Sequence, residues 1–256
     1  MKSAFLMFSP IYRLSLKLRF GTDFTALSSS RLSKNFPNRV LQSRAEWRGA
    51  ARKARQLRLP LHRAEEKNWD HVAAVEAIVG ATAKSARILD AGAELYSNVL
   101  PSLFAYGYRD LFGINLSFVH PARRGPIRYL PGDITHTEFP DCFFDAITCM
   151  SVIEHGVPAG AYFREMFRIL KPGGILVTST DYCPTTIDTR GKIAHGSPIK
   201  IFSKRDVEEM LNLAFESGLE PTASLDLDCT ARPIHWEAYD LNFSFVIFTL
   251  LKPLRA

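Results

Sequence analysis

Long apolar runs are scarce in this 256-residue chain. The longest strongly apolar segment near the C-terminus, Phe243 to Leu251, is about half the roughly 20 residues that a membrane-spanning helix needs. The stretch Ala4 to Phe8 is too short for a secretory signal peptide, and no A-x-A cleavage site follows it. The sequence therefore predicts no transmembrane segment and a cytoplasmic location.

Cysteine is also sparse, because the chain holds four residues of this type. None of them belongs to a C-x-x-C pair, and all fall in or beside segments that resemble core strands: Cys142, Cys149, Cys183 and Cys229. This pattern is typical of reduced thiols in a cytosolic protein, and it argues against a disulfide framework or a zinc site. We therefore predict no structural metal.

Acidic side chains are nearly absent from residues 1–64, where only Asp23 and Glu46 accompany fourteen Lys and Arg. Residues 65–256 are mildly acidic, with 18 basic and 24 acidic side chains. We predict a basic N-terminal extension over residues 1–67, partly helical and partly disordered, followed by a globular domain over 68–256. A solvated extension is the first interpretation, and binding to nucleic acid, an anionic membrane or an acidic partner is the alternative. The extreme N-terminus also resembles a transit peptide.

Short apolar strands alternate with helical segments in the middle of the chain. This alternation requires crossover connections and predicts a parallel sheet buried on both faces. The expected strands are Ala86–Asp90, Leu111–Asn115, Arg128–Leu130, Phe144–Met150 and Ile175–Thr180, and the expected helices between them are Val99–Tyr106 and Ala161–Leu170.

The flanking segments carry their own signals. Arg39 to His62 has the pattern of a basic helix, and Asp70 is placed to cap the next helix. Near the C-terminus, Ser203 is an expected N-cap with Asp206 three residues later. The last two strand-like runs, Ser224–Asp228 and Asn242–Leu250, predict a hairpin-like ending with one antiparallel strand.

Polar residues follow several of the expected strands. Asp90 and Gly92 end the first one, and ligands of open α/β sheets bind beyond the carboxyl ends of strands. Gly92 permits close approach of a ligand to the backbone. Asn115, after the next strand, is placed to bond ribose hydroxyls. Asp133 is placed to accept from an exocyclic amine, and Ile134 to cover a purine face. These residues predict a nucleoside site.

Four segments resemble the bacterial class I S-adenosylmethionine-dependent methyltransferases of the broad type 11 group, over roughly Asn68 to Lys252. They are ILDAG, PGDI, FDAITCMSVIEHG and FREMFRILKPGGILVTSTDY. The resemblance implies a Rossmann-like fold with a seven-stranded, mostly parallel sheet, one antiparallel strand and helices on both faces. It also implies S-adenosylmethionine as the cofactor.

The resemblance carries residue roles onto matching positions. His155 matches a position close to the transferable methyl group. Two departures stand out, because Glu94 and Tyr96 replace the later glycines of D-x-G-x-G-x-G, and Asn115 replaces the usual acid. The Glu94 side chain either clashes with the cofactor's methionine carboxylate or turns outward and bonds its ammonium. The implied cofactor-binding residues are Asp90, Ala91, Gly92, Ala93, Glu94, Asn115, Leu116, Gly132, Asp133, Ile134, Met150, Ser151 and Val152.

The acceptor side is expected in the long segment from Asp181 to Phe202, because loops of this length inside a domain are usually functional. His155 is the first candidate for a catalytic base, and Asp181 or His195 is the second. We predict methyl transfer to a hydroxyl or amine of a small molecule or saccharide. The alternatives are a non-catalytic binding domain and, less favoured because residues 65–256 are acidic, a nucleic-acid methyltransferase. The sequence does not indicate the oligomeric state.

Overall fold

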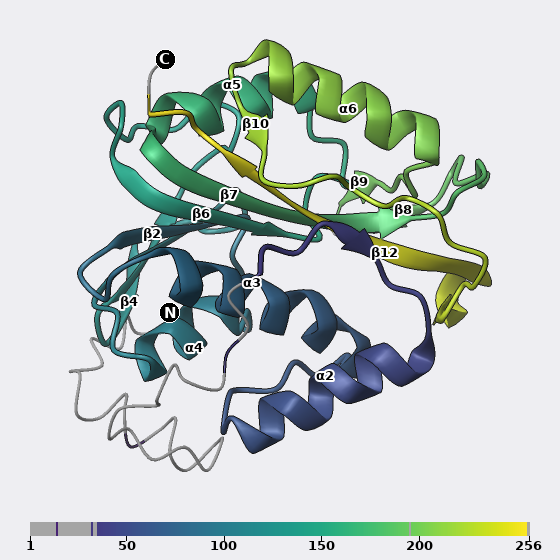
Figure 1. Ribbon diagram of the computed structural model, residues 1–256, viewed down its shortest axis with the longest axis horizontal. Coiled ribbons are helices and arrows are strands. Elements are labelled where there is room, and N and C mark those ends of the chain that lie inside the picture. Colours follow the sequence, from purple (N-terminus) through teal and green to yellow (C-terminus); the bar gives the residue numbers. More distant parts are fainter. Residues whose placement is uncertain (1–13, 15–31, 33–34, 195, 255–256) are drawn as a thin grey trace.

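The computed structural model describes residues 14, 32, 35–194 and 196–254 and shows a ten-stranded mixed β-sheet between two layers of helices (Figure 1). The part of the extension expected to be disordered lies almost entirely outside these residues. The sheet runs in the order β1-β12-β7-β6-β2-β3-β5-β4, and β10 and β11 also pair with β12. Its strands are β1 (Arg39–Val40), β2 (Arg87–Ala91), β3 (Asp110–Asn115), β4 (Ala122–Arg124), β5 (Ile127–Pro131), β6 (Phe144–Met150), β7 (Leu170–Tyr182), β10 (Glu220–Pro221), β11 (Ile234–Trp236) and β12 (Leu241–Leu251). A separate two-stranded sheet is formed by β8 (Ile193–Ala194) and β9 (Ser197–Pro198).

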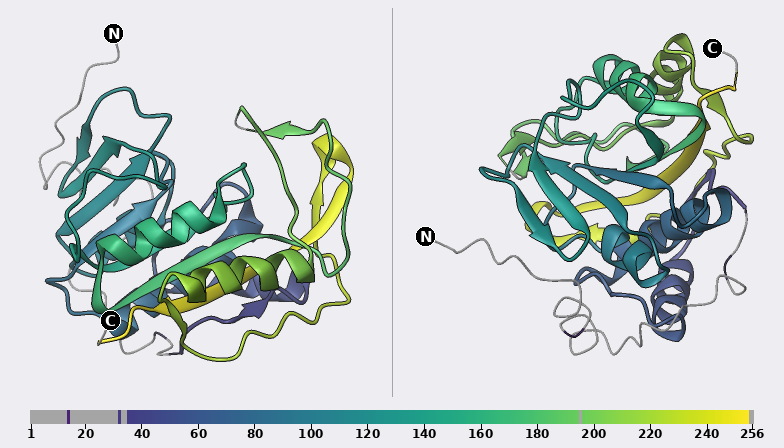
Figure 2. Two further views of the ribbon diagram at one scale, coloured as in Figure 1. Left: turned by 90° about the horizontal axis from the view of Figure 1, so that it is seen from above. Right: turned by 90° about the vertical axis from the view of Figure 1, so that its left-hand side faces the viewer.

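Helices cover both faces of this sheet. Those on one face pack around Trp69, Val72 and Leu103, and those on the other around Phe163, Met166 and Val207. Figures 1 and 2 show α5 and α6 together on one face, with α3 and α4 on the opposite one. The helices are α2 (Arg44–Gln56), α3 (Asn68–Ala81), α4 (Val99–Ala105), α5 (Ala159–Ile169) and α6 (Lys204–Glu216).

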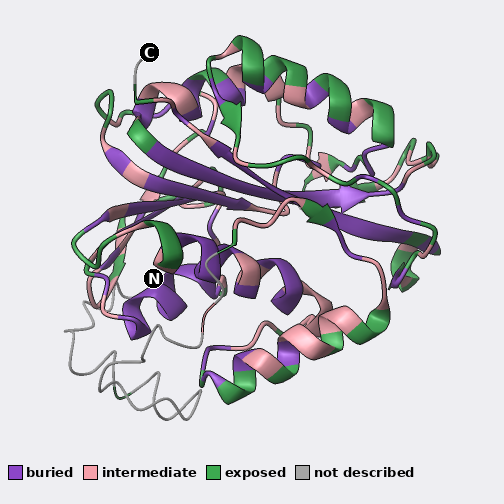
Figure 3. Cartoon of the chain, viewed as in Figure 1, coloured by how far each residue is buried: buried purple, intermediate pink, exposed green. Residues whose placement is uncertain are grey.

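The parallel strands are buried on both faces because helices cover them on each side. Along β6 every residue except Asp145 and Met150 is buried, and β7 is buried from Ile175 to Tyr182. Figure 3 shows these central strands as the most continuously buried part of the chain. Helix α6 begins as predicted, since Ser203 and Asp206 form a reciprocal capping box.

The predicted fold class is confirmed, and the strand count differs. The sheet has ten strands rather than seven, because six of the seven expected strands are present and β1, β4, β10 and β11 are short additional strands that pair antiparallel with their neighbours. The long antiparallel strand is β12, which pairs with β7 over eight residue pairs. Strands of two or three residues carry too little periodicity to be predicted from a sequence.

Three local predictions were wrong. Asp70 does not cap α3, which begins at Asn68, and its Oδ2 instead accepts a hydrogen bond from Ser179 Oγ at 2.7 Å. Segment 224–228 is no strand, since only Asp226 makes a single bridge, to Arg39. The hairpin partner of β12 is β11. The basic helix predicted in the pattern of residues 39–62, with its end before Pro60, is shorter, because Ser43 caps α2 at its start and the helix ends at Gln56.

The segment before α2 packs against the sheet. Leu41 N donates to Phe245 O at 2.8 Å, and Thr249 N donates to Asn38 Oδ1 at 3.0 Å. Val40 and Leu41 are fully buried. The domain boundary at residue 68 stays a prediction, but residues 38–41 already contribute to the edge of the sheet. Within the described residues, no helix is long and apolar enough to cross a bilayer.

Candidate functional site

The strand order reverses between β2 and β6. The chain runs from β2 through β3 to β5 on one side, and then returns to β6 and β7 on the other. Because all five strands are parallel, their carboxyl ends lie along one edge, and ligands of such sheets bind in the crevice at the reversal. The loops after β2 and β6 therefore define the candidate site.

Asp90 and Thr148 join the two strands at this point. Thr148 Oγ1 donates to Asp90 Oδ1 at 2.8 Å, and both side chains are buried. Burial raises the pKa of Asp90 to about 7, and the hydrogen bond from Thr148 opposes that rise. The carboxyl group thus changes charge close to neutral pH, which is characteristic of functional sites.

Gly92 brings the two loops into contact. Its φ of +84° lies in the left-handed region, and its N–H donates to Ile114 O at 2.8 Å. A Cβ at this position would lie 2.5 Å from Cγ2 of Val152. Only glycine fits here without displacing Val152. The structure therefore brings together Gly92 and Val152, two of the predicted cofactor-binding residues.

The Glu94 side chain bends toward the end of β3. Its Oε1 accepts from Ser117 Oγ at 3.1 Å and from Asn115 Nδ2 at 3.4 Å. Asn115 Nδ2 also donates to Gly92 O at 3.0 Å. The carboxylate of Glu94 and the amide of Asn115 thus form one polar group beside the loop after β2. Leu116, another predicted cofactor contact, is exposed.

The predicted adenine contacts follow β5, next to this group. Gly132 N donates to Asn115 O at 3.2 Å, so the ends of β3 and β5 are held together. Asp133 is exposed, and its Oδ1 accepts from both the N–H and the hydroxyl of Thr135. Ile134 is buried in the core. The predicted ribose residue and the predicted adenine residues therefore lie next to each other along the same edge of the sheet, at the ends of the neighbouring strands β3 and β5.

A partly buried cation, Lys67, marks the ends of β6 and β7. Lys67 Nζ donates to Ser151 Oγ at 2.6 Å and lies 3.5 Å from Asp181 Oδ1. It also lies 3.9 Å from the ring centroid of Phe245. Burial opposes the charge, but the carboxylates of Asp181 and Asp70 outweigh it and raise the pKa of Lys67. Lys67 comes from a 3₁₀ turn, Glu65–Lys67, and no pattern in the sequence predicted its role.

Carboxylates surround this cation on both sides of β7. Asp70 binds Ser179, while Glu154 Oε2 accepts from Thr180 Oγ1 at 3.0 Å on the opposite face. Burial, together with the charge of Asp181, raises the pKa of Glu154 to about 8. Burial also raises the pKa of Asp181, and Lys67 opposes that rise. Beside the cation, Glu154 is therefore a carboxyl group able to exchange a proton near neutral pH, and Asp181 is a second one whose pKa is raised.

The predicted catalytic residues are only partly brought together. Asp181 lies beside Lys67 at the carboxyl end of β7. His155 is half-buried in the turn after β6, where its N–H donates to Val152 O at 3.1 Å. His195 lies outside the described residues. Met150 belongs to the same edge, since Ser179 Oγ contacts its sulfur at 3.7 Å.

The loop after β7 returns to the site at both of its ends. Phe202 N donates to Asp181 O at 3.0 Å, and Lys200 N donates to Glu154 O at 2.9 Å. An open hollow of about 580 Å³ lies between residues 186–201 of this loop and the start of α6. Tyr182 belongs to the core rather than to this hollow, because its hydroxyl donates to Leu227 O.

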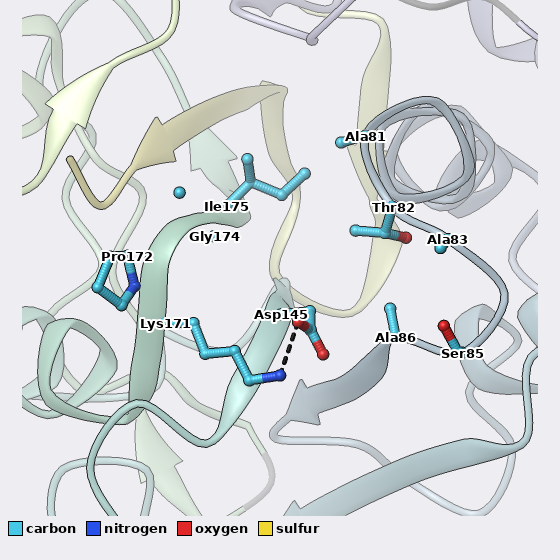
Figure 4. Close-up of a pocket in the computed structure, with 11 residues that line it drawn as sticks. Ala81, Thr82, Ala83, Ser85, Ala86, Asp145, Lys171, Pro172, Gly174 and Ile175 are labelled. Atoms are coloured by element: carbon cyan, nitrogen blue, oxygen red, sulfur yellow. Dashed lines mark hydrogen bonds and ion pairs between the residues drawn. The ribbon is translucent and has the colours of Figure 1, made fainter. Parts of the chain in front are cut away.

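A second hollow, of about 370 Å³, lies at the opposite edge of the sheet (Figure 4). Its lining includes the amino-terminal parts of β6 and β7, where Lys171 Nζ donates to Asp145 Oδ1 at 2.7 Å. Since ligands of parallel sheets bind beyond the carboxyl ends, this hollow is not part of the candidate site.

Comparison with known proteins agrees with this geometry. Residues 89–178 match the family model described as a methyltransferase domain. A probable S-adenosylmethionine-dependent methyltransferase of Mycolicibacterium smegmatis is 27% identical over 144 residues, which are 56% of this chain and 51% of that protein. A demethylmenaquinone methyltransferase of Mycolicibacterium gilvum is 30% identical over 137 residues, which are 54% and 59% of the two chains. The family resemblance predicted from the sequence is confirmed for this domain.

This chain spans about half the length of the first of these relatives. Among solved structures, the [4+2]-cyclase SpnF shares the fold with a TM-score of 0.54 and 17% identity, over 76% of this chain and 86% of that one. At this identity the likeness concerns the fold alone. The chemistry must be argued from the residues of the site.

Proposed function

We propose that this chain, whose residues 89–178 match the methyltransferase domain, transfers a methyl group from S-adenosylmethionine to a hydroxyl or amine of a small molecule or saccharide. The observation that carries the proposal is the polar edge at the strand reversal. There Asp90, Glu94 and Asn115 lie on the nucleoside side, and Lys67 and Asp181 lie on the other. The demethylmenaquinone methyltransferase relative, by its name, also acts on a small molecule.

The residues present fit this cofactor. The bound sulfonium supplies an electrophilic methyl group, so the protein has to align an acceptor and manage one proton. Gly92 permits close approach of the backbone, and Glu94 Oε2 accepts no hydrogen bond within the described part of the chain. Asp181 and Asp70, the two carboxylates that contribute most to the raised pKa of Lys67, outnumber this cation, which favours a positively charged sulfonium nearby.

Asp181 is the base that this geometry favours. It lies at the carboxyl end of β7, is largely buried, and its raised pKa makes the carboxylate a stronger base than an exposed aspartate. Lys67 beside it neutralises part of its charge and fixes its position. His155, from the turn after β6, is the second candidate.

A saccharide or small-molecule acceptor would enter beside the loop between β7 and α6. Both ends of that loop are hydrogen-bonded to residues of the site, and the 580 Å³ hollow beside it has the size of an ordinary ligand pocket. Its lining mixes isoleucines with Thr, Arg and Lys side chains, which suits an acceptor with both apolar and polar groups.

Calorimetry with S-adenosylmethionine and S-adenosylhomocysteine tests the proposal. We expect binding of both at micromolar to millimolar concentration, followed by methylation in an acceptor screen with labelled cofactor. Absence of heat for both ligands would exclude the proposed reaction. Binding without turnover across hydroxyl and amine acceptors would favour the non-catalytic alternative.

A nucleic-acid acceptor is the second alternative, and the basic extension motivates it. Exposed arginines follow one side of α2 at positions 44, 48, 52 and 55. Deleting residues 1–34 leaves β1 and Lys67 in place, whereas a cut at residue 64 would remove a strand of the sheet. Because this deletion leaves the four arginines of α2 in place, they are replaced by alanine in a second variant. Nucleic-acid binding that falls steeply with salt, and is lost when the deletion and the four substitutions are combined, would support the alternative.

A further inference from the structure

The Glu94 carboxylate lies at the end of β3, although residue 94 belongs to the loop after β2. We propose that Glu94, rather than Asn115, is the ligand of the cofactor's ribose. In this arrangement Asn115 and Ser117 position the carboxylate, and the three side chains form a site for a vicinal diol. The inference rests on the proposed use of S-adenosylmethionine.

The side chain of Asn115 is already occupied by protein contacts. Its two amide hydrogens have the acceptors Gly92 O and Glu94 Oε1, at 3.0 and 3.4 Å. Its Oδ1 accepts from Ser117 N at 2.8 Å. Asn115 therefore anchors the loop after β2 to the end of β3. A ribose hydroxyl would have to displace one of these contacts to bind the amide nitrogen.

Glu94 has an oxygen that can accept hydrogen bonds from a ligand, whereas the side-chain atoms of Asn115 are occupied by protein contacts. Its Oε1 accepts from Asn115 and Ser117, while no donor to Oε2 lies within the described residues. A carboxylate accepts without donating, and the two hydroxyls of a ribose are donors. Hydrogen bonds to an ionised acceptor are roughly twice as strong as neutral ones. The free oxygen of Glu94 is thus suited to a diol.

The position of the carboxylate also fits a ribose. Dinucleotide-binding sheets place an acid on the ribose about 20 residues after the glycine-rich turn, at the end of the next strand. In this chain that strand is β3, and its end carries Asn115. The acid reaches the same place from the preceding loop. Glu94 therefore supplies, from the loop after β2, the carboxylate that Asn115 does not supply at the end of β3.

Ligands with and without the diol separate this role from a purely structural one. The probes are S-adenosylhomocysteine and its 2′,3′-dideoxy analogue, each titrated into the full-length chain by calorimetry. Glu94→Gln and Glu94→Gly are the test variants. Glu216→Gln, an exposed change on α6, is the matched control, and thermal unfolding confirms that every variant folds.

We expect Glu94→Gln to weaken S-adenosylhomocysteine binding about 10-fold and to leave the affinity for the dideoxy analogue within about twofold of wild type. Glu94→Gly should weaken S-adenosylhomocysteine binding at least as much. An equal loss for both ligands would overturn the inference, since Glu94 would then act only on the loop. Tighter binding by Glu94→Gly would also overturn it. Failure of the wild-type chain to bind either ligand would overturn the proposed function as well.

Discussion

The ammonium of Lys67 lies 3.5 Å from the carboxylate of Asp181 and joins the segment before α3 to the carboxyl end of β7. Lys67 precedes the segment that matches the methyltransferase domain. A residue outside the family segment therefore sets the charge at the proposed reacting end. The first predictions concern this pair.

Removal of the cation should destabilise the fold. Lys67→Met leaves Asp70 and Asp181 buried without their shared counter-ion, and breaking a buried pair costs about 3–5 kcal/mol. Because the Lys67 side chain is 22% exposed, we expect the lower part of this range at pH 8. The loss should shrink at acid pH, where the carboxylate of Asp181, whose pKa burial raises, becomes protonated. Urea unfolding at both pH values measures it, and Lys67→Arg is the charge-preserving control. An equal loss at both pH values would contradict the ion-pair explanation.

Substitution of Asp181 should slow the reaction more than it weakens cofactor binding. Asp181→Asn removes the proposed base, and loss of a general base lowers the rate about 10²–10⁴-fold. Since burial raises the pKa of Asp181, the wild-type rate should rise with pH through that pKa, and the variant should lose the rise. Pre-steady-state rates with labelled cofactor give both the rate of methyl transfer and the affinity for the cofactor. A larger loss in His155→Ala than in Asp181→Asn would assign the base to His155.

The buried carboxyl group of Asp90 should lower stability as the pH rises. In the unfolded chain it ionises near 3.8, but in the folded state its pKa is about 7. Between these pH values unfolding therefore releases a proton from Asp90, so the contribution of Asp90 to the free energy of unfolding falls as the pH rises from about 4 to 7 and is constant above pH 7. Asp90→Asn has no such group, so its advantage should grow to about 4 kcal/mol above pH 7. Urea denaturation at pH 5 and pH 8 tests this, and a pH-independent difference would show that Asp90 is not the titrating group.

The central strands and the helices of this fold could be predicted from the sequence because each is specified by a local pattern of apolar and capping residues. β6 has the predicted bounds, Phe144 to Met150, and the cap of α6 is formed by the predicted residues, Ser203 and Asp206. Burial on both faces makes such strands continuously apolar, so they stand out in a sequence. The two-residue strand β1 carries no comparable pattern, and its pairing with β12 joins residues about 200 positions apart.

The sequence predicted which residues lie at the strand ends that form the site, but not which side chains contact one another there. Asp90 contacts Thr148, and Gly92 approaches Val152, because strand ends of a parallel sheet share one edge. The direction of the Glu94 side chain depends on the amide of Asn115 and the hydroxyl of Ser117, which are distant in sequence. Lys67 was missed for the same reason, since its partners come from the ends of β6 and β7.

The contact between Gly92 and Val152 gives the last prediction. Gly92→Ala introduces two separate penalties, namely a side chain at φ +84° and a Cβ that would lie 2.5 Å from Val152 Cγ2. Together they should lower stability by roughly 2–4 kcal/mol. Val152→Ala removes the clashing methyl groups but leaves the backbone conformation unchanged.

The double variant should therefore recover part of the loss. We expect a favourable coupling free energy of about 1–2 kcal/mol between Gly92→Ala and Val152→Ala, measured by urea unfolding of the wild type, both single variants and the double variant. The remaining deficit reports the backbone strain at residue 92. Strictly additive effects would mean that Val152 moves aside without cost, and the loops after β2 and β6 would then be more loosely packed than the structure shows.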